Sequence, residues 1–142
     1  MPTMAAKKRA RRRTSLQNLS GKWKISEMPD LTEEYLAESK DPHMLLTVRG
    51  KSVSRHFEYG LSNGELDGNV IESEGKPLEI RFSFEGFDEM DEDSGYGEAF
   101  LSENNKTLTG TLHVHRGDDW RFICRKTRWN HAHSEILVIA LS

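Results

Sequence analysis

Apolar and polar side chains alternate with a period of two residues through eight short segments of this chain, and this pattern constrains its fold most strongly. In residues 78–85, apolar side chains occupy every even-numbered position and polar side chains every odd-numbered position. Successive side chains of a β-strand point to opposite faces of a sheet, so the pattern predicts strands with one buried face. The predicted strands cover residues 19–25, 43–49, 52–59, 65–72, 78–85, 96–102, 107–115 and 118–126.

The connections between these segments are mostly short and contain turn-forming residues, as at Gly50-Lys51. A parallel crossover needs about a dozen residues or more, so we expect antiparallel neighbours. Closure of the resulting meander into a barrel would remove its unpaired strand edges. Residues 31–38 predict one short helix after the first strand, with Asp30 as its N-cap and Glu33 three positions later. The predicted fold class is all-β, an antiparallel up-and-down eight-stranded β-barrel.

The charge of the chain is divided between a basic N-terminal arm and an acidic remainder. Residues 1–18 hold six of the 20 Lys and Arg residues and none of the 23 acids, so the rest has a net charge of −9. A dense block of like charge without apolar periodicity predicts a disordered arm. Its cations, in residues 7–13, suit a nuclear-import-like address, a non-specific grip on nucleic acid or anionic lipid, or a solubilising tail. We expect no other nucleic-acid binding, because the acidic remainder opposes the approach of DNA.

Several sequence features bear on the compartment. The arm lacks the apolar stretch of a secretory signal, and no run of about 18 apolar residues predicts a membrane span. The single cysteine, Cys124, excludes an internal disulfide and a Cys-rich metal site. We therefore expect an intracellular, cytoplasmic protein, with a mitochondrial presequence as the alternative interpretation of the arm.

A C-terminal tail, residues 127–142, follows the barrel domain predicted for residues 19–126. The tail contains six consecutive apolar residues, Ile136–Leu141, which must be covered. They would form a closing strand, a helix packed on the barrel, or an adhesive surface that makes the protein a homo-oligomer.

Arg55 is the most unusual residue of the predicted inward face. It alternates with Val53 and Phe57, so the pleat points it inward, where an unpaired guanidinium is costly. A carboxylate-bearing ligand in the lumen would pair with it. Two alternatives are an ion pair with Glu98 and a bulge that turns Arg55 to solvent. The predicted ligand-binding residues of the lumen are Arg55, Trp23, Phe57, Tyr59, Phe82, Phe84, Trp120 and Phe122.

Whether the lumen is hollow stays open. An eight-stranded barrel is just wide enough to be filled by its own side chains or to hold one small ligand. Inward glycines, at positions 21, 68, 97 and 110, would bend the strands or leave space inside.

Other clusters predict no specific chemistry. The acidic segment Asp88–Gly95 is interpreted as a solvated turn, with calcium as the alternative. Paired histidines, at 113 and 115 and at 131 and 133, are interpreted as surface residues because no third metal ligand matches them. Since nothing pairs a nucleophile with a base, we expect no catalytic residue, no cofactor and no resident metal.

The first strand carries the motif Gly21-Lys22-Trp23, and together with eight meandering strands it resembles the calycin superfamily of lipocalins, fatty-acid-binding proteins and avidins. The resemblance covers roughly residues 19–126. It implies that Trp23 plugs one end of the barrel and that a basic residue of the last strand, Arg121 or Arg125, packs on it. It does not extend to biotin binding, because Ile25 stands where avidins carry a polar contact.

We therefore expect a non-enzymatic barrel that binds a small apolar or carboxylate-bearing ligand in its lumen. The alternative is a solid-core barrel that serves as an interaction or oligomerisation module. A lumen-based enzyme of the isomerase or cyclase type, for which the resemblance offers precedent, is the third possibility.

Overall fold

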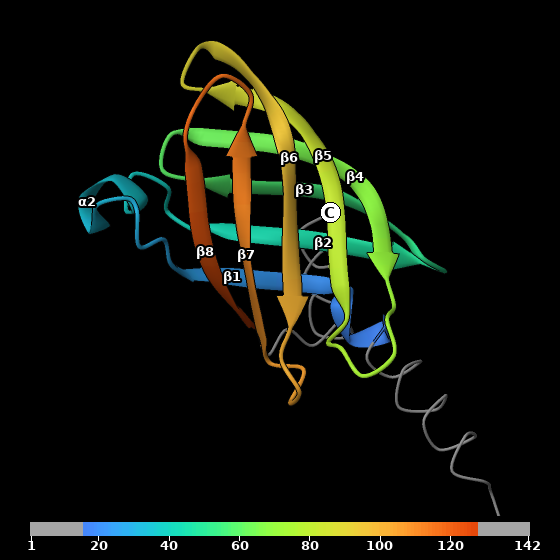
Figure 1. Ribbon diagram of the computed structural model, residues 1–142. Coiled ribbons are helices and arrows are strands. Elements are labelled where there is room, and N and C mark those ends of the chain that lie inside the picture. The colour runs from blue at the N-terminus through green and yellow to red at the C-terminus, as the bar shows by residue number, and fades with distance from the viewer. Residues whose placement is uncertain (1–15, 128–142) are drawn as a thin grey trace, which may run out of the picture.

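The computed structural model, in which residues 16–127 are described here, is a closed eight-stranded barrel in which each strand pairs with its neighbours in chain order and β8 pairs with β1 (Figure 1). All pairings are antiparallel. The strands are β1 (Gly21–Glu27), β2 (His43–Arg49), β3 (Ser52–Tyr59), β4 (Ser62–Ile71), β5 (Glu79–Asp88), β6 (Asp91–Leu101), β7 (Thr107–Val114) and β8 (Asp119–Lys126). The predicted all-β, up-and-down barrel is confirmed. Within residues 16–127, no helix is long and apolar enough to cross a membrane.

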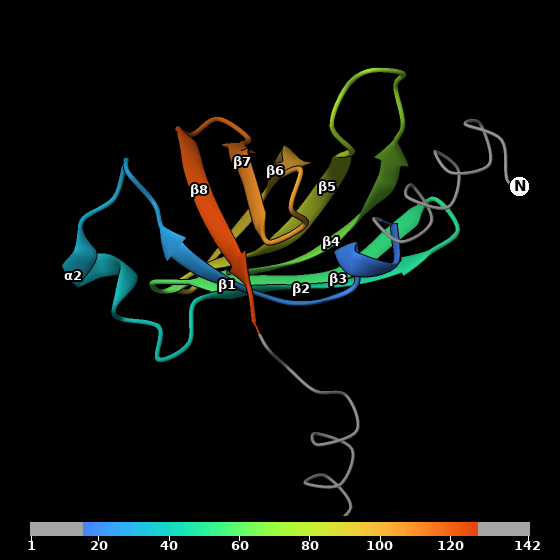
Figure 2. The same ribbon diagram turned by 90° about the horizontal axis from the view of Figure 1, so that it is seen from below.

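The two ends of the barrel are capped differently. A helix, α2 (Glu33–Leu36), lies at one end, and a helical turn of residues 16–19 lies at the other, as Figures 1 and 2 show together. Residues 16–18, which were predicted to belong to the arm, are therefore helical, and this turn precedes β1. The other residues of the arm, and nearly all of the C-terminal tail with its apolar run, lie outside the described residues.

Helix α2 is shorter than predicted, and its N-cap is Thr32 instead of Asp30. The Thr32 hydroxyl accepts a hydrogen bond from the backbone N–H of Tyr35 at 3.1 Å, which satisfies one of the free donors at the helix start. Asp30 instead accepts from the guanidinium of Arg121 on β8 at 2.9 Å. This bond holds the pKa of Asp30 down at about 2 and ties the β1–α2 loop to the last strand.

The predicted acidic turn is largely strand. Strand β5 continues to Asp88 and β6 begins at Asp91, so only Glu89 and Met90 remain in the turn. Glu89 has a φ of +58°, the positive value that reverses a chain over so few residues. Acidic residues are uncommon in strands, and for this reason their propensity predicted a loop.

The interior is filled by apolar side chains, and the inward glycines make room for aromatic rings. A Cβ added at Gly97 would lie 2.6 Å from Cζ of Phe82, and one at Gly95 would lie 2.8 Å from Cζ of Phe84. Both phenylalanines are buried. Burial stabilises each Phe by roughly 1.5–3 kcal/mol. Of the four glycines predicted to point inward, Gly97 therefore makes room for a ring. Gly68 and Gly110 instead lie against backbone, where an added Cβ would lie 2.0 Å from the carbonyl oxygens of Arg81 and Glu98.

Trp23 closes the end of the barrel beside the N-terminal turn. Its side chain is fully buried, and its Nε1 donates to the carbonyl of Leu19 at 2.9 Å. The basic residue over its ring is Lys126, with Nζ 4.8 Å from the ring centroid, and the expectation of Arg121 or Arg125 is wrong. Lys126 Nζ also donates to the carbonyls of Asn18 and Ser20. Burial lowers its pKa to about 8.

Candidate functional site

Most of the predicted lumen residues share one interior. The aromatic side chains that are buried in it are Trp23, Phe57, Tyr59, Phe82, Phe84 and Phe122. Trp120 is half-buried and packs against the same cluster. Their rings contact one another, as in the edge-to-face pair of Phe57 and Phe84, whose centroids are 5.3 Å apart. These residues form a packed core. Tyr59 and Trp120 also line one surface hollow, and Phe82 lines another.

Arg55 does not belong to the interior, and the expectation of a buried guanidinium is wrong. Its side chain is exposed, although its pairing partners Leu46 and Leu66 are both buried. Its φ of +121° is a value that L-residues rarely adopt and that redirects the Cβ out of the regular pleat. The structure thus favours the alternative in which a local irregularity turns Arg55 to solvent.

One hollow opens at the end of the barrel that carries α2, opposite Trp23, and we call it the mouth pocket. It has a volume of about 360 Å³. Its walls come from the β3–β4 and β5–β6 hairpins, the β7–β8 turn and the α2 segment. Its lining residues are Leu31, Tyr35, Tyr59, Ser62, Asp88, Glu89, Asp93, Val114, Gly117, Asp118 and Trp120.

A small hydrogen-bond network fixes the polar side of the mouth pocket. Ser62 Oγ donates to Asp88 Oδ1 at 2.9 Å, and the hydroxyl of Tyr35 lies 3.3 Å from both of these atoms. Ser62 and Asp88 are directly paired residues of β4 and β5, and Tyr35 reaches them from α2. The network holds one carboxylate in place between a helix and two strands, and that carboxylate keeps further acceptor sites free.

The electrostatics of the mouth pocket favour positive charge. Four carboxylates line it, those of Asp88, Glu89, Asp93 and Asp118, and none of its lining residues is Lys or Arg. Burial raises the pKa of Asp93, and the nearby Asp88 carboxylate adds to the rise. Desolvation also raises the pKa of Tyr59 to about 12, so its hydroxyl stays protonated and available as a donor.

Apolar surface completes the mouth pocket. Leu31 and Val114 supply aliphatic carbons, and Trp120 supplies an aromatic ring. An apolar wall with a few fixed polar groups is the usual composition of a small-molecule site. The mouth pocket has this composition, and its arrangement therefore suits the binding of a small molecule.

The sequence did not single out Tyr35 or Ser62, and it placed Asp88 only in a predicted acidic turn. Their meeting depends on the extension of β4 and β5 beyond their predicted ends, which pairs Ser62 with Asp88. It also depends on the path of the chain through α2, which no periodic pattern encodes. A longer β4–β5 hairpin was the one signal that could have brought the two residues together.

The histidines form two polar arrangements outside the mouth pocket. His113 lies between Glu98 and Asp119, with one ring nitrogen 2.8 Å from each carboxylate. His43 and His56 face each other with their Nε2 atoms 3.2 Å apart. His115 is exposed, and residues 131 and 133 lie outside the described part of the chain. Within residues 16–127, no three His, Cys, Asp or Glu side chains are grouped so that they could hold a metal ion.

Comparison with known proteins adds no relative. No protein-family model matches the chain, and neither a curated protein nor a solved structure matches it with statistical significance. What the structure establishes is therefore the architecture, an eight-stranded antiparallel up-and-down β-barrel that is compatible with a calycin-like protein.

Proposed function

We propose that this protein is a non-enzymatic, calycin-like barrel that binds a small, partly apolar ligand with a positive charge in the mouth pocket. The observation that carries the proposal is the composition of that hollow, in which an aromatic and aliphatic wall faces four carboxylates and no cation. Its volume of about 360 Å³ lies within the range of about 300–1,000 Å³ typical of ligand sites.

The calycin-like part of the proposal rests on both barrel ends. Trp23 with Lys126 over its ring closes one end, as the resemblance implies for a basic residue of the last strand. The other end, beside α2, carries the hollow. Ligands of small β-barrels commonly enter at the mouth, so the location suits binding.

The charge of the expected ligand differs from the initial expectation of a carboxylate. Arg55 does not line the mouth pocket, and an anion there would face Asp88, Asp93 and two further acids. A carboxylate that binds a charged donor contributes about 1.5–3 kcal/mol. The aromatic ring of Trp120 adds an attraction for cations.

A titration with three matched probes tests the proposal. Phenethylamine, 2-phenylethanol and phenylacetate share an aromatic ring and differ in charge, and binding is followed by calorimetry and by the NMR signal of the Trp120 indole N–H. We expect phenethylamine to bind most tightly. Asp88→Asn should weaken its binding about tenfold, which corresponds to about 1.4 kcal/mol.

Glu103→Gln, which removes an exposed carboxylate outside the pocket lining, is the matched control and should leave the affinity unchanged. Equal binding of phenylacetate and phenethylamine would contradict the expected charge. If none of the probes binds, the alternative function remains, a solid-core interaction module, for which the packed interior is the supporting observation.

A further inference from the structure

The outward side chains of β4, β5 and β6 form a continuous surface that we call the acidic face. Its five cross-strand rows contain six carboxylates, from Glu65, Asp67, Glu79, Glu85, Glu92 and Glu98. The only cation in these rows is Arg81. Its Nε donates to Glu79 at 2.8 Å, so its charge is already matched. Figure 1 shows the three strands side by side along one side of the barrel.

Most of the carboxylates on the acidic face lack a positive partner. Glu98 pairs with His113 on β7. Glu65, Asp67, Glu85 and Glu92 form no ion pair with any other residue of the described chain.

Two of these carboxylates repel each other directly. Glu65 and Glu85 are directly opposite across β4 and β5, an arrangement that destabilises a sheet unless a cation intervenes. Burial lowers the pKa of the neighbouring His56, so that residue supplies little positive charge at neutral pH.

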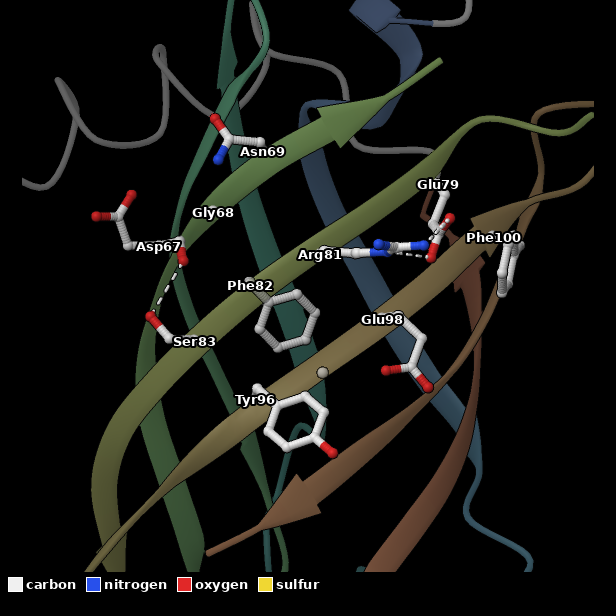
Figure 3. A pocket seen from close by; sticks show the side chains of 11 residues that line it. Asp67, Gly68, Asn69, Glu79, Arg81, Phe82, Ser83, Tyr96, Glu98 and Phe100 are labelled. Atoms are coloured by element: carbon white, nitrogen blue, oxygen red, sulfur yellow. Dashed lines mark hydrogen bonds and ion pairs between the residues drawn. The ribbon is translucent and has the colours of Figure 1, made fainter. Parts of the chain in front are cut away.

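The acidic face is hollowed and carries exposed aromatic rings. One hollow, of about 700 Å³, is lined by Asp67, Glu98, Tyr96 and Phe100 among others (Figure 3). Tyr96 is 60% exposed and Phe100 is 45% exposed, and Figure 3 shows both rings on the same side of the sheet as Glu98. A second hollow, of about 710 Å³, is lined by Glu65, Glu85, Glu92 and Phe87. Such rings attract guanidinium groups, whose flat faces stack on them.

We propose that the acidic face docks the basic arm of the same chain, residues 7–13. The arm carries six cations and no acid, and it therefore complements a face with six carboxylates and one cation. An extended chain rises about 3.3 Å per residue, so the seven residues of the arm span about 23 Å. The acidic face has a similar length, because Asn63 and Asn69 on β4 lie about 20 Å apart at the same rise per residue. The charge and length of the arm both suit the face.

The arm also starts within reach of the acidic face. The described chain begins at Leu16, and the turn it opens is bonded to β2 through the Val48 N–H, which donates to Ser20 Oγ at 2.9 Å. Val48 pairs with Val53, which pairs with Gly68 on the floor of the first hollow. Arg13 is three residues and Lys7 is nine residues before Leu16, so an extended chain lets them lie up to about 10 Å and about 30 Å from it.

Tethering makes even weak docking effective. A short flexible linker holds the two partners at an effective concentration in the millimolar range, so a weak intramolecular contact is populated. Because the contact is between exposed charges, salt screens it, and the Debye length falls from about 10 Å at 0.1 M to about 3 Å at 1 M. Docking of the arm would cover the acidic face at low salt and release it at high salt.

A spin label on the arm of the full chain tests the proposal. Ala10→Cys introduces an accessible thiol, whereas the native Cys124 is buried and burial raises the pKa of its thiol. A nitroxide at position 10 should broaden the backbone amide signals of residues 63–69, 81–87 and 92–98. The broadening should fall at least threefold between 50 mM and 500 mM NaCl.

Charge-removing variants locate the contact. Glu65→Gln with Glu85→Gln should reduce the broadening at least threefold, and the substitutions also relieve a repulsion and so preserve the fold. Arg11→Gln with Arg12→Gln and Arg13→Gln should do the same from the side of the arm. Glu33→Gln with Glu34→Gln removes two exposed charges from α2 at the far end of the barrel and should change nothing.

Three results would overturn the proposal. The first is a broadening of amide signals that is spread evenly over the barrel. The second is a broadening that persists in the Glu65→Gln and Glu85→Gln variant. The third is a broadening caused only by the spin label of another copy of the chain. A mixed sample detects the third result: one set of chains carries the spin label and no isotope, and the other set carries the isotope and no spin label. None of these readouts depends on a ligand in the mouth pocket.

Discussion

At the scale of single residues, the close approach of Gly97 to Phe82 shows how tightly this part of the barrel interior is packed. An added Cβ would lie 2.6 Å from Cζ of Phe82 and 2.9 Å from the carbonyl oxygen of Thr111. We expect Gly97→Ala to lower the free energy of unfolding by about 1–3 kcal/mol, because overpacking forces the ring from its place. Urea unfolding at pH 7 measures the change. In a Phe82→Leu background, the shorter side chain should make the same substitution cost at least about 1 kcal/mol less. Equal costs in both backgrounds would show that the ring is not the obstacle.

At the scale of strands, His113 links β6, β7 and β8, because its protonated ring donates a hydrogen bond to a carboxylate on each side. It lies on β7, between Glu98 on β6 and Asp119 on β8, and its ring stacks on Tyr96 with centroids 4.6 Å apart. The hydrogen bond to Glu98, followed by that to Asp119, raises its pKa above the usual value of about 6.5. The protonated form is favoured in the folded state, so the stability that His113 contributes is fully present below about pH 6.5 and is lost as the pH rises through its raised pKa.

The raised pKa of His113 determines how the effect of His113→Gln should depend on pH. The variant should be destabilised by about 0.5–1 kcal/mol at pH 5.5 and by less at pH 9, as measured by chemical unfolding at both values. NMR titration of the imidazole should give a pKa above 6.5 that falls in Glu98→Gln. His115→Gln, at an exposed position just past the end of β7, is the control and should leave the stability unchanged. A loss of stability independent of pH would rule out the ion pairs as its cause.

The same strands show which features were predictable from the sequence. The bounds of β2 and β3 match their predictions, because alternation and tight turns are local properties. Lys126 is separated from the buried Phe122 and Cys124 by an even number of residues, so alternation places it on the inward face and its position over Trp23 was predictable. Alternation places Arg121 and Arg125 on the outward face. The outward direction of the Arg55 side chain did not follow from alternation, because its positive φ interrupts the alternation from which the inward face was inferred.

At the scale of the whole molecule, the barrel is closed where β8 meets β1, and Lys126 lies at this seam. It pairs with Trp23 across the seam and bonds the carbonyls that lead into β1. Since its pKa is lowered to about 8 from an unfolded value near 10.5, the unfolded chain binds the proton more tightly between these values. The free energy of unfolding that depends on Lys126 should therefore rise as the pH increases from about 8 to 10.5.

Comparison with Lys126→Met isolates this contribution from the other groups that titrate in the same range, Tyr59 among them. Methionine keeps the apolar stem and does not titrate, so the unfolding free energy of the wild type relative to the variant should increase by about 1 kcal/mol between pH 7.5 and pH 10. Chemical unfolding of both proteins across this range measures the difference. A constant difference would mean that the Lys126 ammonium is as well solvated in the closed barrel as in the unfolded chain. The seam would then be held by the hydrogen bonds between β1 and β8 and by the buried ring of Trp23, without a cost in desolvated charge.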